Sequence, residues 1–322
     1  MARLEVVPFS DEHLDGAAAL LAARHAADRR VEPLLPERYE DPAAAREELE
    51  LAWRAEAAYG AAATRGGRLV GYLIGAPRDP KVWGDNVWVE LAGHAAEEAE
   101  DVRDLYAAAA ARWVDEGRTR HYALVPARDA SYVDGWFRLG FGQQQAHGVR
   151  EVPERTDVRA PEGVEIRRPA RDEIGDLIEV DLALPRHQRQ SPVFSGMPEW
   201  AREELEQEWI DTLDGDEEEV LAACVEGKPV AVWSIVRPGV GAQHRGLGLP
   251  DASGFLGFAS TLPEHRRTGI GVALTDASFA RAAELGYRSM ITDWRVTNLL
   301  SSRFWPRRGF RIFALRLYRS IP

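Results

Sequence analysis

The residues best suited to chemistry lie in one short segment, residues 263–272, in which two arginines precede two glycines. An apolar, strand-like run at 254–259 leads into this segment, and a helical pattern at 273–285 follows it. The first N–H groups of a helix have no intrahelical partner, and the helix dipole places partial positive charge on them. Gly269 and Gly271 allow the backbone to approach a ligand closely, and arginine suits phosphate. The segment therefore predicts a pyrophosphate site, although such a turn can also serve only to cap its helix.

The spacing of these residues differs from two common phosphate-binding motifs. A dinucleotide fold requires a third glycine where Leu274 stands, and a P-loop requires Gly-Lys-Ser/Thr. The pattern present is Arg-x-x-Gly-x-Gly, formed by Arg266, Gly269 and Gly271. This pattern resembles the acetyl-CoA signature of the GCN5-related N-acetyltransferase (GNAT) family.

A second block of residues downstream strengthens the resemblance. The family usually shows Asn-x-x-Ala-x-x-Phe-Tyr-x-x-x-Gly-Phe in this region. The residues at the corresponding positions of this chain are Asn298, Ser301, Phe304, Trp305, Gly309 and Phe310. The resemblance covers about residues 163–322 and implies an N-acetyltransferase that moves an acetyl group from acetyl-CoA to an amine.

The resemblance also implies where the acyl donor lies. In the family, two parallel strands splay apart around the pantetheine arm, and here these strands would be residues 254–261 and 289–295. One strand N–H would polarise the thioester carbonyl. The residues to which the resemblance assigns acetyl-CoA binding are Ala259, Ser260, Thr261, Arg266, Arg267, Thr268, Gly269, Ile270, Gly271, Val272, Asn298 and Phe304.

The usual catalytic groups of the family are missing. An amine must lose a proton before it attacks a thioester, since an alkylamine has a pKa near about 10.4. The family often places a glutamate on the strand before the pyrophosphate loop and a tyrosine near the thiolate, where this chain has Phe255 and Trp305. An indole N–H is a donor only. Asp251, Asp293 and His244 are candidate bases, each with a structural alternative: loop solvation for Asp251 and His244, and a structural hydrogen bond for Asp293.

The acceptor is predicted to be a small molecule or a peptide that carries an amine. The segment predicted to bind it is residues 184–200, between the first two helices of the second half, because this segment is long, mixed and punctuated by prolines. It could equally be a structural loop. The missing acid and base leave an alternative function open, namely a non-catalytic acyl-CoA-binding module.

The elements that position these residues occur twice along the chain. Residues 102–141 align without a gap to residues 271–310, so that Trp136 meets Trp305 and Phe141 meets Phe310. The predicted fold class is α/β, with two tandem GNAT-like domains, each a mixed sheet with a splayed central strand pair flanked by helices. The predicted domains are a degenerate copy at 1–152, a linker at 153–162 and an acetyl-CoA-binding domain at 163–322.

The first copy lacks the elements of the anion site. In the alignment, glutamates replace the arginines and the first glycine, Val102 replaces Gly271, and Asp129 replaces Asn298. Acidic side chains at the start of a helix satisfy its dipole and repel a phosphate. We therefore predict that the first half does not bind acetyl-CoA through this site.

Composition excludes several classes of protein. The chain has 322 residues, 45% of them hydrophobic, and a net charge of −12, which argues against nucleic acid as a partner. No apolar run approaches the roughly 18 residues that span a membrane, and no signal-peptide pattern is present. Cys224 is the single cysteine and the histidines have no metal-ligand spacing, so no disulfide and no metal are predicted. The predicted location is the cytoplasm, and the oligomeric state stays undetermined.

Overall fold

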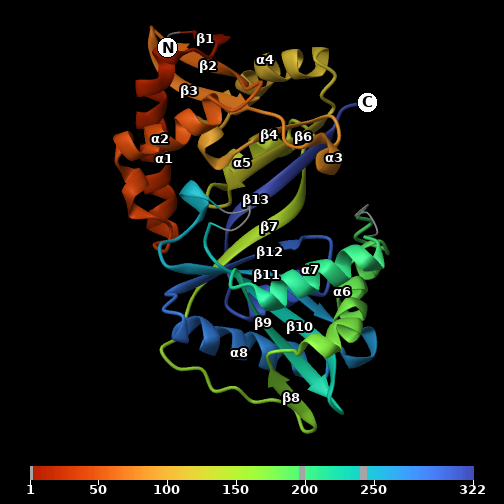
Figure 1. The fold of residues 1–322 in the computed structure, drawn as a ribbon. Coiled ribbons are helices and arrows are strands. Elements are labelled where there is room, and N and C mark those ends of the chain that lie inside the picture. The colour runs from red at the N-terminus through yellow and green to blue at the C-terminus, as the bar shows by residue number, and fades with distance from the viewer. Residues whose placement is uncertain (1–2, 196–199, 240–244) are drawn as a thin grey trace. The chain divides into compact units, whose positions relative to one another are not determined.

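The computed structural model describes residues 3–195, 200–239 and 245–322. The chain divides into two compact units (Figure 1). The first comprises Met1–His147, Arg245–Pro250 and Ile312–Pro322, and the second comprises Gly148–His244 and Asp251–Arg311. The units are therefore not consecutive halves of the chain. The domains predicted at 1–152 and 163–322 were defined by the sequence repeat and not by contacts, and they stay a prediction.

The first unit has an α/β arrangement with two sets of paired strands. In one set the order is β1-β2-β3-β5, and in the other β6 pairs with β4 on one edge and with β13 on the other. The strands are β1 (Leu4–Pro8), β2 (Tyr59–Arg65), β3 (Arg68–Gly75), β4 (Asn86–Val89), β5 (His94–Ala96), β6 (Arg120–Pro126) and β13 (Arg311–Ser320). The helices are α1 (Leu14–Val31), α2 (Pro42–Trp53), α3 (Pro80–Trp83), α4 (Asp101–Asp115) and α5 (Ala130–Phe137). Strand β7 (Gly142–Glu151) starts in this unit and ends in the second.

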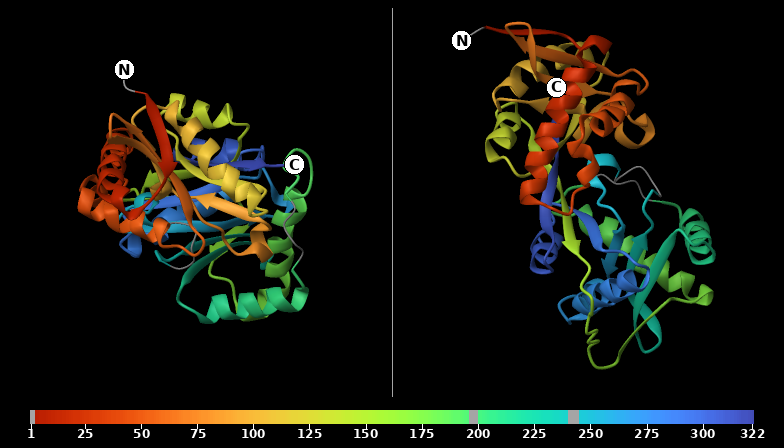
Figure 2. Two further views of the ribbon diagram at one scale, coloured as in Figure 1. Left: turned by 90° about the horizontal axis from the view of Figure 1, so that it is seen from above. Right: turned by 90° about the vertical axis from the view of Figure 1, so that its left-hand side faces the viewer.

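Helices α1 and α2 pack against each other and against the sheet of the first unit (Figure 2). Their contact faces contain Leu14, Leu21 and Leu49, which are fully or almost fully buried, together with Tyr72 of β3. Helix α2 begins where the Asp41 side chain accepts a hydrogen bond from a backbone N–H of the first turn, ahead of a proline that suits this position.

The second unit contains the strands and helices that form the predicted site. Its strand order is β12-β11-β10-β9-β8, and every pair is antiparallel except β11 with β12. The strands are β8 (Val164–Arg167), β9 (Glu218–Val225), β10 (Lys228–Val236), β11 (Ser253–Thr261) and β12 (Ser289–Arg295). The helices are α6 (Ile174–Gln188), α7 (Arg202–Asp214), α8 (Ile270–Glu284) and α9 (Ser301–Arg307). No helix in the described part of the chain is long and apolar enough to cross a membrane.

Helices pack on both faces of this sheet. Successive side chains of β10 point to opposite faces and contact the helices on each side. Val232 joins a cluster with Leu177 and Trp209, which come from α6 and α7. The next residue, Trp233, points to the other face, where it lies beside Gly271 of α8 and Trp305 of α9. The sheet is thus a central layer between two sets of helices.

Strands β11 and β12 part midway along their length. Their parallel pairing runs from Ser253 opposite Ser289 to Leu256 opposite Thr292 and ends there, although both strands continue. Beyond this point β11 stays paired with β10, with a register shift around Gly257. A bulge of this kind bends one strand away from its neighbour. The predicted splay between these two strands is confirmed.

One predicted boundary was wrong. Residues 184–188 were expected in a loop between the first two helices, but α6 continues to Gln188 with Pro185 inside it. The helix tolerates this proline near its end because its preceding turns pack into the core through Leu177, Ile178 and Val180. Residues 196–199 of the same predicted segment lie outside the described residues.

Candidate functional site

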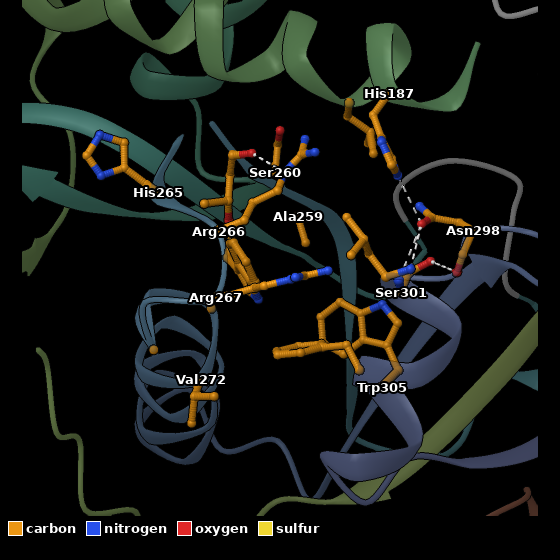
Figure 3. A pocket seen from close by; sticks show the side chains of 17 residues that line it. His187, Ala259, Ser260, His265, Arg266, Arg267, Val272, Asn298, Ser301 and Trp305 are labelled. Atoms are coloured by element: carbon orange, nitrogen blue, oxygen red, sulfur yellow. Dashed lines mark hydrogen bonds between the residues drawn. The ribbon is translucent and has the colours of Figure 1, made fainter. Parts of the chain in front are cut away.

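A cavity of about 500 Å³ opens in the second unit beside the last residues of β11, past the point where its pairing with β12 ends (Figure 3). Its walls come from the last turn of α6, the end of β11, the start of α8 and the start of α9. The lining residues are Leu184, His187, Trp233, Ala259, Ser260, Thr261, His265, Arg266, Arg267, Gly269, Gly271, Val272, Asn298, Leu300, Ser301, Phe304 and Trp305.

The start of α8 presents backbone donors to this cavity. Gly269 caps the helix with a φ of 92°, a left-handed conformation that glycine adopts without strain. The first N–H with an intrahelical acceptor there is that of Ala273, which donates to the Gly269 carbonyl. The N–H groups of Ile270, Gly271 and Val272 precede it and have no acceptor within the helix. This geometry suits an anion.

Two arginines lie beside these donors. The Arg266 Nε donates to the Thr261 carbonyl at 3.1 Å, which ties the side chain to the end of β11. Burial lowers the pKa of the Arg266 guanidinium, but a guanidinium remains charged at any physiological pH. Arg267 is exposed and has a φ of 66°. The two cations and the helix N-terminus make this end of the cavity electropositive.

Gly271 lies where any side chain would enter the cavity. A Cβ at this position would lie 3.5 Å from Trp233 and 3.6 Å from Phe304, which are ordinary contact distances. A methyl group therefore fits, whereas a longer side chain would project into the space between α8, β10 and α9.

Strand β11 offers its free edge to the cavity. Past Leu256 the strand is paired only with β10, so its other edge has no strand partner among the described residues. The Ser260 hydroxyl donates to the Val180 carbonyl of α6 at 2.6 Å and is buried. This hydroxyl therefore holds α6 against β11, and the backbone of Ala259–Thr261 is the part of the strand that a ligand could meet.

Asn298 organises the start of α9. Its side chain is 4% exposed, and its Oδ1 accepts hydrogen bonds from the backbone N–H groups of Leu300, at 3.1 Å, and Ser301, at 3.4 Å. Asp129, the aligned residue of the first unit, makes the same kind of contact with the N–H groups that begin α5. Asparagine and aspartate share this ability to satisfy a helix start.

Trp305 occupies the position at which the family often has tyrosine. Its ring is buried and makes edge contacts with Phe304 and Phe310, at 4.9 and 5.4 Å between ring centroids. It lines the cavity, but it has no hydroxyl to offer a departing thiolate.

Two of the three predicted bases, Asp251 and Asp293, do not line this cavity. Asp251 is exposed and precedes the first residue of β11, whereas the cavity lies at the last residues of that strand. Asp293 is half-buried on β12 and is not among the lining residues. His244 lies outside the described residues. Of the predicted cofactor residues, Thr268 and Ile270 also do not line the cavity.

His187 is the main cavity residue that the sequence did not single out. It lies on the last turn of α6, and its Nε2 is 3.2 Å from the Asn298 Oδ1 (Figure 3). The signal available in the sequence was a histidine in the segment predicted to bind the acceptor. Leu184, like His187, belongs to that segment, whereas Trp233, His265, Leu300 and Ser301 were not predicted as site residues.

In the first unit, buried side chains fill the space between β5, β6 and α5. Two short strands precede α4 in this unit: β4, which pairs with β6, and β5, which pairs with β3. His94, the first residue of β5, is 0% exposed, and its ring contacts the Leu124 carbonyl of β6 and the Tyr132 hydroxyl of α5, each at 2.8 Å. Val102, aligned with Gly271, is also fully buried.

Comparison with known proteins agrees with this geometry. Residues 184–310 match the sequence model of the acetyltransferase (GNAT) family. This range includes every residue that lines the cavity. The chain therefore carries a GNAT-family domain, as its sequence predicted.

Solved structures share the fold over nearly the whole chain. A GCN5-related N-acetyltransferase from Sphaerobacter thermophilus aligns with 98% of this chain and 95% of its own, at 16% identity and a TM-score of 0.61. A glucosamine N-acetyltransferase region of a fungal multi-domain GH3 beta-N-acetylglucosaminidase covers 99% of this chain and 38% of that one, at 16% identity and a TM-score of 0.57. At such identities the likeness concerns the fold alone. Among curated proteins no significant match was found.

Proposed function

We propose that this chain is an acetyl-CoA-dependent N-acetyltransferase that acts on an amine of a small molecule or a peptide. The observation that carries the proposal is the cavity beside the end of β11, past the point where its pairing with β12 stops, which extends to the N-terminus of α8. The match of residues 184–310 to the GNAT family supports it. A cytoplasmic location remains a prediction from the sequence.

The residues present fit the acyl donor. The free N–H groups at the start of α8, with Arg266 and Arg267, supply positive charge for a pyrophosphate. The free edge of β11 offers backbone groups that pair with an amide-containing arm as an added strand does. Trp233 and Phe304 supply apolar surface along the same wall.

Acetyl transfer then depends on the positioning of the amine against the thioester and on one backbone hydrogen-bond donor. A β11 N–H directed at the thioester carbonyl would stabilise the oxyanion that forms when the amine attacks. Trp305 cannot protonate the leaving sulfur. A thiol resembling that of cysteine, with a pKa of about 8.5, can depart as a thiolate without an enzymic acid.

We further infer that the first unit does not bind acetyl-CoA. His94 occupies the space between β5 and β6, and the carboxylates near the start of α4 are already paired with arginines. Arg65 contacts Asp101 through two hydrogen bonds of 2.7 and 2.8 Å. Both features disfavour the binding of a second pyrophosphate group in the first unit.

The test combines binding and turnover. Purified protein is titrated with acetyl-CoA by calorimetry, and CoA release is then followed with a thiol reagent across a panel of small-molecule and peptide amines. Amine-dependent CoA release supports an enzyme. Binding without release for every amine would instead favour a non-catalytic acyl-CoA-binding module.

The Gly271→Glu variant tests the anion site. The glutamate fills the space beside Trp233 and Phe304 and places a negative charge where a phosphate would lie, so we expect a loss of acetyl-CoA affinity of at least about 100-fold. Gly271→Ala should keep most of the affinity because its methyl group fits.

Gly175→Glu is the matched control. Gly175, like Gly271, is the second residue of its helix and follows an isoleucine, and a Cβ there meets only the tip of Arg202 at 4.0 Å. This variant should bind acetyl-CoA as the unchanged protein does. Normal binding by a folded Gly271→Glu variant would refute the assignment of the anion site.

A further inference from the structure

His187 and Asn298 form a pair on one side of the cavity. In Figure 3 they lie across the cavity from His265 and from Arg266, which belongs to the electropositive end. His187 comes from α6 and Asn298 from the turn before α9, and the His187 Nε2 lies 3.2 Å from the Asn298 Oδ1. The imidazole thus stands at the end of the cavity that is remote from the proposed phosphate site.

The contacts of Asn298 determine which atom of its amide faces the imidazole. The backbone N–H groups of Leu300 and Ser301 both donate to Oδ1, so this atom must be the oxygen and the amide cannot be flipped. An oxygen can only accept. The His187 Nε2 therefore carries the proton that it shares with Asn298.

This hydrogen bond defines the tautomer of His187. In a neutral imidazole one nitrogen carries a proton and the other a lone pair. With the proton on Nε2, the lone pair is on Nδ1, for which no partner is recorded within the ranges that the structure describes. A histidine held in one tautomer by an oxygen on its other nitrogen is the arrangement that general-base catalysis uses.

We propose that His187 is the general base that accepts the proton of the acceptor amine through Nδ1, and that Asn298 positions it. The proposal rests on the proposed acetyltransferase function. The amine nitrogen forms a C–N bond to the thioester carbon, and its proton passes to Nδ1. The C–S bond breaks, its electron pair leaves with sulfur as the CoA thiolate, and the imidazolium returns its proton to solvent or to that thiolate.

Other charged groups near the cavity bear on the pH dependence. His265, Arg266 and Arg267 line the same cavity, Arg186 and Arg189 flank His187 on the chain, and Arg295 ends β12. The arginines stay charged throughout the working range. His265 is therefore the other titratable group besides the arginines and His187 that lines the cavity.

The main test replaces His187 by glutamine. The amide of His187→Gln can still donate to Asn298, but it has no basic nitrogen. We expect kcat to fall by about 100- to 10,000-fold, with acetyl-CoA affinity within about threefold by calorimetry, and the acidic limb of the pH profile of kcat/KM to disappear. Added imidazole should restore part of the rate. Gln207→Ala, on α7 and outside the cavity, is the control.

Asn298→Asp tests the positioning role. The carboxylate keeps an oxygen for the start of α9, as Asp129 does for α5, and it stabilises a protonated imidazole. We expect the acidic limb to move to higher pH, which a purely structural residue would not cause. An active wild type with an unchanged rate and pH profile in His187→Gln would overturn the assignment of His187 alone. A wild type inactive with every amine would overturn the proposed function as well.

Discussion

Single residues decide how this site departs from the GNAT pattern. Trp305 stands where the family often has tyrosine, and apolar neighbours surround its ring. The side chain therefore contributes packing and shape. Side chains from other elements, His187 among them, therefore act in acid–base catalysis.

The role of Trp305 can be tested by Trp305→Phe. We expect turnover to change by only a few-fold, because no proton is donated from this position, whereas the free energy of unfolding falls by about 1–3 kcal/mol as buried contacts are lost. Trp305→Tyr can even raise turnover, since it adds an acid. CoA release and denaturant titrations measure the two effects. A thousandfold loss in a variant that still binds acetyl-CoA would contradict this view.

At the level of elements, the features that could be predicted were those formed by one contiguous stretch of the sequence. The strand, the turn with Gly269 and Gly271, and the following helix lie within one stretch of sequence, and each has its own local cause. The splay of β11 from β12 followed from the family resemblance. The pairing of His187 with Asn298 could not be predicted, because it joins distant residues and depends on α6 continuing past Pro185.

The difference between the two units predicts the stoichiometry of binding. The second unit has an open gap beside β11, whereas His94 fills the gap in the first. Calorimetry should therefore give one acetyl-CoA per chain, and Gly271→Glu should remove all of the binding heat. A value of two, or a residual site in Gly271→Glu, would show that the first unit binds the cofactor.

On the scale of the whole molecule, the units should respond differently to acid. Burial lowers the pKa of His25, of His94 to about 3 and of His121 to about 4, and all three lie in the first unit. Below pH 6.5, the ordinary pKa of histidine, these side chains are protonated in the unfolded chain but stay neutral in the folded unit. Stability therefore falls as pH drops below 6.5, by about 1.4 kcal/mol per pH unit for each histidine that stays neutral.

The second unit contains a group with the opposite effect. Burial and the neighbouring Glu208 raise the pKa of Asp181 to about 6, so the folded unit takes up a proton before the unfolded chain does. The resulting contribution to the stability of the second unit is present at low pH and is lost as pH rises through 6. Hydrogen exchange should show α1 and β6 losing protection between pH 6.5 and 5, ahead of α6. Equal loss in both units would contradict the prediction.

Strand β13 has a consequence for how the protein is made. It pairs with β6 from Ala314 opposite Pro126 to Ser320 opposite Arg120, so the unit that contains the N-terminus is completed by the last strand of the chain. On the ribosome, β6 emerges long before β13 and must wait, with one edge unpaired, through the synthesis of the entire second unit. The first unit to be translated is therefore the one that cannot finish folding until β13 has been made.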